Sequence, residues 1–226
     1  FNGLKIKYEH IIIDNNSNDN TVPLIKQLIK KNKSIKLIIN NKNYGQLASP
    51  VHGIKQSTGD ATILINADFQ DPPELIVKLI DSWKSGNKIT LLQKNISAEP
   101  FYINYLRKFY YWFLNKISDV NLTKNTTGSG IIDKSIVEIL KKIEDPIPYL
   151  RGLLAEIGPK ISLIKFNQPL RLKGKSKNNL FSLMDIAILG IIKQSKLPLR
   201  FMTLCGLTIS ILSFFCMLQL LLGGDY

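Results

Sequence analysis

The chain has 226 residues, of which 45% are hydrophobic and 21% charged, and its 30 Lys and Arg against 17 Asp and Glu give a net charge of +13. This apolar content is too high for a disordered chain, and the ordinary use of Gly and Pro excludes collagen-like and mucin-like proteins. The two cysteines share one apolar run and the two histidines are far apart, which argues against a disulfide framework and against a Cys or His metal site. The length fits one globular domain with an appendage.

Segments typical of strands and of helices alternate along the first part of the chain. Strand-type runs lie at 9–14, 36–40, 61–65 and 88–93, and helix-type segments begin near Thr21 and lie at 48–57 and 73–85. Such alternation predicts an α/β fold, with a mostly parallel sheet and helices on both faces. Ligands of such folds bind where the strands end. Acids follow two of the expected strands, at Asp14 and at the pair Asp68 and Asp71.

A further helix-type segment at 101–117 contains seven Phe and Tyr residues together with Trp112. Two interpretations are open for it. It is either a platform for an acceptor near lipid, or a core helix with a wide aromatic face.

The C-terminal part predicts a membrane-spanning helix. Residues 201–222 contain no charge over 22 positions, and a helix of that length extends about 33 Å, enough to cross a hydrocarbon core of about 30 Å. A buried core helix is the alternative, and a signal peptide is excluded by the position. Apolar residues at helical spacing in 180–195 predict a helix at the membrane interface, with packing against the globular domain as its alternative.

Basic residues concentrate before the expected span. Residues 165–200 contain eight Lys and Arg against one acid. This charge predicts a cytoplasmic globular domain and attraction to anionic lipid headgroups. Nucleic acid is not an expected partner, because the cluster adjoins a span and no helix-turn-helix or zinc-finger pattern is present. The expected units are a globular domain at 1–165, a basic loop with a juxtamembrane amphipathic helix at 166–200, and a transmembrane helix at 201–222.

The two ends of the chain suggest a fragment. The sequence opens without Met directly before a strand, and it ends just after one span. Because folds of this type usually begin with another strand in the middle of the sheet, we expect an N-terminal strand to precede the chain and a second span to follow it.

Four stretches together carry a family resemblance. They read IIIDNNSNDNT, NKNYGQLASPVHGIKQSTGDATILINADFQDPPE, EDPIPYLRGLLAEIG and RLKGKSKNNLFSLMDIAILGIIKQSKLPLR, in this order. The chain resembles family 2 glycosyltransferases of the membrane-bound branch that transfers sugars to bactoprenol or dolichol phosphate, from Tyr8 to the span. The resemblance implies a GT-A-like fold, a nucleotide-diphosphate sugar donor of the UDP type, a divalent metal (Mg²⁺ or Mn²⁺) and an inverting hexosyl transfer. It also implies a polyprenyl-phosphate or surface-glycan acceptor and a bacterial-type plasma membrane.

Site residues follow from the resemblance position by position. Asp14 resembles the acid that contacts the nucleobase, and Asn43 and Gly45 resemble the turn that opens a helix near the nucleotide. Asn66 stands at the first position of the family's Asp-x-Asp motif, where it offers only a neutral oxygen or an NH donor. Asp68 matches the second acid and is the expected metal ligand.

The resemblance leaves the catalytic base open. The stretch at 126–133 lacks the Asp that many lipid-phosphate relatives carry, and Glu156 and Asp133 are the remaining candidates. A phosphate acceptor requires no strong base. Candidates for binding phosphates or lipid are the basic residues of one loop, Arg171, Lys173, Lys175 and Lys177.

A second hypothesis is a catalytically inactive, membrane-anchored module that binds nucleotide sugar or serves as a scaffold. Asn66 and the absent Asp motivate it. The sequence identifies neither the sugar nor the oligomeric state, and a homo-oligomer stays open.

Overall fold

Strands and helices alternate along most of the chain. The computed structural model describes residues 6–95, 101–118, 123–169 and 180–222. The elements are, in order, β1 (His10–Asp14), α1 (Thr21–Lys31), β2 (Ile35–Ile39), α2 (Gly45–Lys55), β3 (Ala61–Leu64), α3 (Leu75–Lys84), β4 (Ile89–Lys94), α4 (Phe101–Ile117), β5 (Thr126–Asp133), α5 (Lys134–Lys142), α6 (Leu150–Glu156), β6 (Ile161–Phe166), α7 (Leu180–Gln194) and α8 (Leu197–Leu222).

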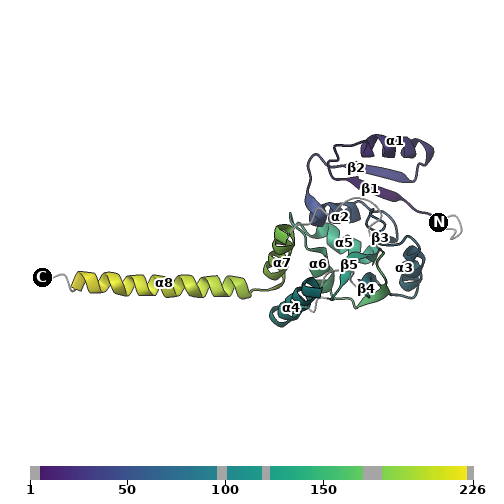
Figure 1. Cartoon of the computed structure of the whole chain (residues 1–226). Helices are drawn as coiled ribbons and strands as arrows, with labels where there is room; N and C mark the ends of the chain where they lie inside the picture. The colour runs from purple at the N-terminus through teal and green to yellow at the C-terminus, as the bar shows by residue number, and fades with distance from the viewer. Residues whose placement is uncertain (1–5, 96–100, 119–122, 170–179, 223–226) are drawn as a thin grey trace.

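The strands form two sheets (Figure 1). One contains β1 and β2 in parallel, and the other has the order β3-β5-β4-β6. In the second sheet β5 runs antiparallel to β3 and to β4, whereas β6 runs parallel to β4. Three strands of the larger sheet therefore share one direction, and the sheet is mixed because of β5 alone.

Helices cover both faces of the larger sheet, which confirms the expected α/β class. On one face Ile132 of β5 packs with Ile136 of α5 and Leu154 of α6. On the other face Ile131 packs with Leu79 of α3. The side chains of adjacent strand residues point to opposite faces, so the isoleucine pair in β5 contributes to both cores.

The aromatic helix α4 is part of the core, as one of its two interpretations expects, and it is also partly exposed. Tyr111 and Leu114 are buried, and Leu114 packs in a third core cluster with Tyr149 at the start of α6 and Ile191 of α7. Other large side chains of α4 are exposed, among them Phe109 and Trp112. One side of the helix is thus core and another side is an apolar surface.

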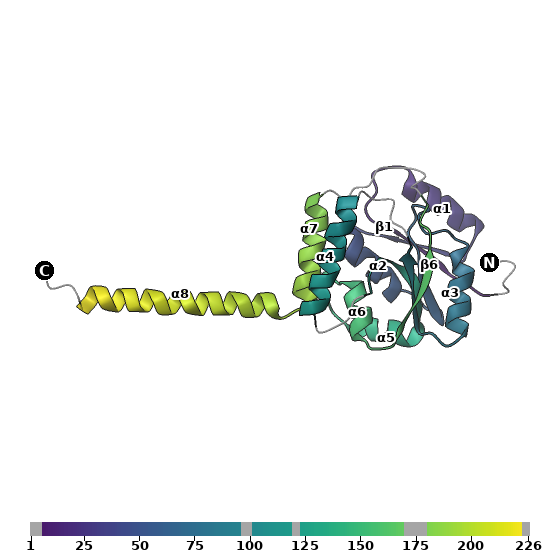
Figure 2. The ribbon, with the colours of Figure 1, turned by 60° about the horizontal axis from the view of Figure 1, so that its bottom comes forward.

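Helix α7 docks on the domain through α4 and α6. The Tyr110 hydroxyl of α4 donates to the carbonyl of Ala187, 3.2 Å away. The Gln194 amide donates to Glu156 of α6 at 3.1 Å. Figure 2 shows α7 lying beside α4 at the side of the domain from which α8 leaves. The opposite side of α7 remains exposed and apolar, with Phe181 and Ile192 prominent.

Helix α8 extends away from the domain as a single rod (Figures 1 and 2). It begins at Leu197, four residues before the expected span, because Pro198 in the first turn is compatible with a helix start. It is long and apolar enough to cross a membrane, and none of its most apolar window is buried. This argues against a buried core helix.

Candidate functional site

The loop that follows β3 contains a buried carboxylate. Asp71 is only 1% exposed, as is Ser129 of β5. The Asn66 side-chain amide donates to Asp71 Oδ2 at 2.8 Å and to Ser129 Oγ at 3.1 Å. Ser129 Oγ in turn donates to Asp71 Oδ2 at 2.5 Å. We call these three residues the polar triangle. Because both donor bonds of Asn66 point inward, Oδ1 is the Asn66 atom left for a ligand.

Asp68 lies two residues beyond Asn66 on the same loop. It is half-buried, and its Oδ1 accepts from the backbone N–H of Gln70 at 3.1 Å. The intervening Phe69 has a left-handed φ of 60° and is exposed, so the chain turns sharply here. The turn places the carboxylates of Asp68 and Asp71 on one short loop with the Asn66 amide.

The loop offers few side-chain ligands for a divalent cation. Asp71 Oδ1 is buried and accepts no hydrogen bond from any described residue. Within residues 6–95, 101–118, 123–169 and 180–222 there is no group of three or more His, Cys, Asp and Glu residues that could bind a metal by themselves. Mg²⁺ commonly binds one or two carboxylates and completes its shell with water and phosphates. Asp68 and Asn66 Oδ1 fit that kind of site.

A second cluster joins the end of β1 to the start of α2. Asp14 is buried, and its Oδ2 accepts from the N–H of Ser17 at 3.0 Å. Asn15 bridges the two segments: its amide donates to Asn43 Oδ1 at 2.7 Å, and its Oδ1 accepts from the N–H of Tyr44 at 2.9 Å. The structure therefore brings Asp14 and Asn43 together, through a neighbour that the motif comparison did not single out.

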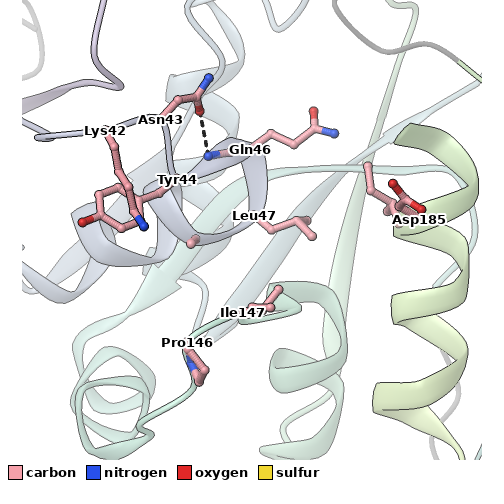
Figure 3. Close-up of a pocket in the computed structure, with 11 residues that line it drawn as sticks. Lys42, Asn43, Tyr44, Gln46, Leu47, Pro146, Ile147 and Asp185 are labelled. Carbon is pink, nitrogen blue, oxygen red and sulfur yellow. Dashed lines mark hydrogen bonds between the residues drawn. The ribbon is translucent and has the colours of Figure 1, made fainter. Parts of the chain in front are cut away.

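Gly45 opens α2 with a left-handed φ of 77°, which favours glycine. Its N–H donates to Asn43 Oδ1 at 2.8 Å. The α2 start also borders an open pocket of about 460 Å³ (Figure 3). Across this pocket lie Ile147 from the loop before α6 and Asp185 of α7. The turn expected near the nucleotide thus faces the juxtamembrane helix.

The two candidates for a base lie apart from the polar triangle. Asp133 pairs with Ala61 at the start of β3, whereas the triangle follows the end of β3. At about 3.3 Å per residue, Asp133 lies roughly 13 Å along β5 from Ser129. There it caps α5 by accepting from Ser135 N–H at 2.9 Å. Burial opposes ionisation, but the hydrogen bonds from Ser135 and Trp83 lower the pKa of Asp133.

Glu156 stands at the C-terminal end of α6. It is exposed, and its carboxylate accepts from Gln194 of α7. The structure joins Glu156 to the juxtamembrane helix and not to the loop of Asp68. The four basic candidates Arg171, Lys173, Lys175 and Lys177 lie outside the described residues.

The chain belongs to glycosyl transferase family 2, whose sequence profile matches residues 4–141. This confirms the family resemblance that the motifs carry.

Two relatives match this chain over most of its length. An uncharacterized glycosyltransferase of Synechocystis sp. is 31% identical over 211 residues, which is 93% of this chain and 66% of that protein. A bactoprenol glucosyl transferase of Shigella phage SfX is 29% identical over 209 residues, covering 91% of this chain and 68% of the relative. The chain spans about two thirds of the length of such relatives.

Solved structures also match. A mannosyltransferase from Pyrobaculum calidifontis, in complex with GDP-Man and Mn²⁺, has a TM-score of 0.45 and 14% identity, and the match covers 73% of this chain and 49% of that one. The crystal structure of TarS from S. aureus has a TM-score of 0.41 and 12% identity, with 71% and 30% covered.

Proposed function

We propose that the protein is an inverting glycosyltransferase that moves a hexose from a UDP-linked donor to a polyprenyl phosphate at the cytoplasmic face of a bacterial-type membrane. The observation that carries the proposal is the polar triangle beside Asp68, because it fixes an amide and a carboxylate where a strand ends. Membership of glycosyl transferase family 2 supports the reaction class. Relatives named bactoprenol glucosyl transferases support the lipid acceptor over a surface glycan.

The donor would lie across the two strand-end clusters. Asp14 and the Asn43–Gly45 turn would bind the nucleoside, since both offer fixed polar groups on neighbouring loops. Asp68 and Asn66 Oδ1 would hold Mg²⁺ or Mn²⁺, which would neutralise charge on the donor diphosphate. Asp71 would keep the Asn66 amide turned so that its oxygen faces the donor.

The acceptor phosphate supplies its own nucleophile. One of its oxygens forms a bond to the anomeric carbon while the bond from that carbon to the diphosphate breaks. The electron pair leaves with the nucleoside diphosphate, and attack from the opposite side inverts the configuration. An anionic phosphate oxygen needs no proton removed, so this reaction is compatible with Glu156 and Asp133 lying away from the triangle.

Membrane contact would involve more than α8. Helices α4 and α7 lie side by side, and each has exposed apolar side chains. We call these side chains together the α4–α7 face; they are Tyr105, Leu106, Phe109, Trp112, Phe181, Met184, Ile188 and Ile192. Lys116 lies over the Trp112 ring, 5.4 Å from its centroid, which adds positive charge beside an aromatic group suited to the interface. This face would rest on the bilayer.

Nucleotide release from membranes that contain the complete protein tests the proposal. The wild type should release UDP only when a polyprenyl phosphate is added. Asp68→Ala should lower this rate by about 100-fold or more, the usual effect of removing one charge-stabilising group. Asp81→Ala, which removes an exposed acid on α3, should leave the rate unchanged.

Each outcome bears on a different part of the proposal. Turnover retained by Asp68→Ala would remove Asp68 from the metal site. Wild-type release that ignores the lipid would refute the acceptor. No turnover at all would favour the inactive module, which the neutral Asn66 motivates.

A further inference from the structure

Arg151 has a positive charge that no described carboxylate pairs with. It is the second residue of α6, it is half-buried, and its Nη1 donates to the Tyr111 hydroxyl of α4 at 3.1 Å. Among the residues that the structure describes, no carboxylate forms an ion pair with it. Buried or half-buried charges are normally paired, so this guanidinium is suited to a negatively charged ligand.

Arg151 also lies against strand β5, at Gly128. A Cβ placed on Gly128 would lie 3.7 Å from Arg151 Nε and 3.9 Å from Nη2. Gly128 directly precedes Ser129, and consecutive Cα atoms are about 3.8 Å apart. The Arg151 guanidinium therefore lies beside the β5 residue that directly precedes Ser129. The missing side chain at Gly128 leaves room in front of it.

The tyrosines around Arg151 do not neutralise it. Burial raises the pKa of Tyr110, and the neighbouring Tyr149 raises it further. Burial likewise raises the pKa of Tyr149, despite the nearby Arg151. Both phenols are therefore uncharged at neutral pH and do not cancel the charge of Arg151, whose direction is fixed by its hydrogen bond to the Tyr111 hydroxyl.

The position of α6 favours the acceptor phosphate over the donor diphosphate. The proposed donor residues lie on loops that follow β1 and β3, whereas Arg151 and Tyr111 belong to α6 and α4. These are the two helices that bind α7, through Glu156 and Tyr110. A phosphate that arrives on a membrane lipid would reach Arg151 from the side of the α4–α7 face.

We propose that the Arg151 guanidinium binds the phosphate of the polyprenyl-phosphate acceptor and that Tyr111 is its positioning residue. A guanidinium matches two phosphate oxygens at once, which would fix the remaining oxygen relative to the anomeric carbon. The inference rests on the proposed function, since it assigns one substrate of that reaction to one side chain.

Steady-state kinetics of the complete protein in liposomes test it, with polyprenyl phosphate and UDP-sugar varied separately. Arg151→Gln should raise the KM for polyprenyl phosphate about 10- to 100-fold, the effect of losing one charge-assisted hydrogen bond. The KM for the UDP-sugar should stay within about twofold. Tyr111→Phe should raise the lipid KM by a smaller factor. Lys160→Gln, at an exposed lysine just beyond α6, is the matched control and should change neither constant.

A binding measurement accompanies the kinetics. Native mass spectrometry of the complete protein with added polyprenyl phosphate and no donor should show retained lipid for the wild type and loss for Arg151→Gln. If that variant does not fold, Arg151→Lys keeps the charge but not the paired donors, and should still raise the lipid KM.

Three results would overturn the inference. An unchanged lipid KM with unchanged lipid retention would remove Arg151 from the acceptor site. A rise in the donor KM alone would assign Arg151 to the diphosphate. A wild type that turns over without any dependence on the lipid would overturn the proposed function and this assignment with it.

Discussion

Removal of the Ser129 hydroxyl tests whether Asp71 is a charged acceptor beneath the site. Ser129→Ala deletes the donor that lies 2.5 Å from Asp71 Oδ2, and it deletes the acceptor of one Asn66 bond. Both Ser129 and Asp71 are 1% exposed, so bulk water does not replace the lost partner. A hydrogen bond to a charged group contributes about 1.5–3 kcal/mol. For a chain of this size that corresponds to a fall in Tm of roughly 3–12 °C.

A neutral hydrogen bond elsewhere in the domain provides the matched control. Ser57 is also buried, and its hydroxyl donates to the carbonyl of Ile54 at 2.7 Å and lies 2.6 Å from Thr62 Oγ1. Neutral bonds contribute about 0.5–1.5 kcal/mol each. Ser57→Ala removes two neutral bonds, whereas Ser129→Ala removes one neutral bond and one bond to a carboxylate. Ser57→Ala should therefore lower the Tm by less than Ser129→Ala does, and it should leave the catalytic rate unchanged.

Two assays on the complete protein in detergent separate the possibilities. Thermal unfolding gives the two Tm values, and initial rates of UDP release give activity. Ser129→Ala should lose about tenfold in rate as well as stability, because the Asn66 amide is then free to rotate. If both variants lose the same Tm and both keep the wild-type rate, Asp71 is not a charged acceptor that orients Asn66, and the reasoning is refuted.

Two further predictions concern carboxylates. Asn66→Asp should lower the Tm in the absence of metal, because the new carboxylate would face Asp71. The same variant should bind Mn²⁺ more tightly. An unchanged or weaker Mn²⁺ affinity by calorimetry would contradict the second expectation. The second prediction concerns Asp145, whose oxygens lie 2.8 and 2.9 Å from Lys193 Nζ. Burial raises the pKa of Asp145, but Lys193 and the other neighbouring groups together lower it by more, so the net pKa lies below the ordinary value. The stability that this ion pair contributes is therefore fully present above the ordinary carboxyl pKa of about 3.9. It is lost as the pH falls through the lowered pKa. Asp145→Asn should cost up to about 1 kcal/mol at pH 7, and its Tm difference from the wild type should shrink toward pH 3; a constant difference would argue against the ion pair.

The order of the elements as far as β4 was predictable from local pattern, whereas β5, β6 and the strand directions were not. Alternating apolar runs predict β1 to β4 and the helices between them, and most of these boundaries lie within three residues of the expected ones. Helix α2 begins at Gly45 and not at residue 48, because Asn43 and Asn15 fix the turn before it. The antiparallel direction of β5 depends on the chain path around α4, and hydrophobic periodicity contains no such information.

The site was predictable as two polar strand ends, but its contacts were not. Asp14 and Asp68 follow expected strands, and the family resemblance adds Asn43 and Asn66. The partnership of Asn66 with Ser129 joins residues 63 positions apart, and it exists only because β3 pairs with β5. The contact of Arg151 with Tyr111 likewise depends on how α6 packs on α4, which no sequence spacing expresses.

The junction between α7 and α8 limits how the domain can move. Only Ser195 and Lys196 separate Gln194 from Leu197, so the connection is shorter than about 11 Å even when fully extended. Helix α7 is bound to the domain at both Ala187 and Gln194. If α8 is anchored in lipid, the domain can therefore move only a short distance relative to the membrane. Under the proposed function, the domain would then exchange nucleotide on the side away from the bilayer and would stay attached to the membrane between turnovers.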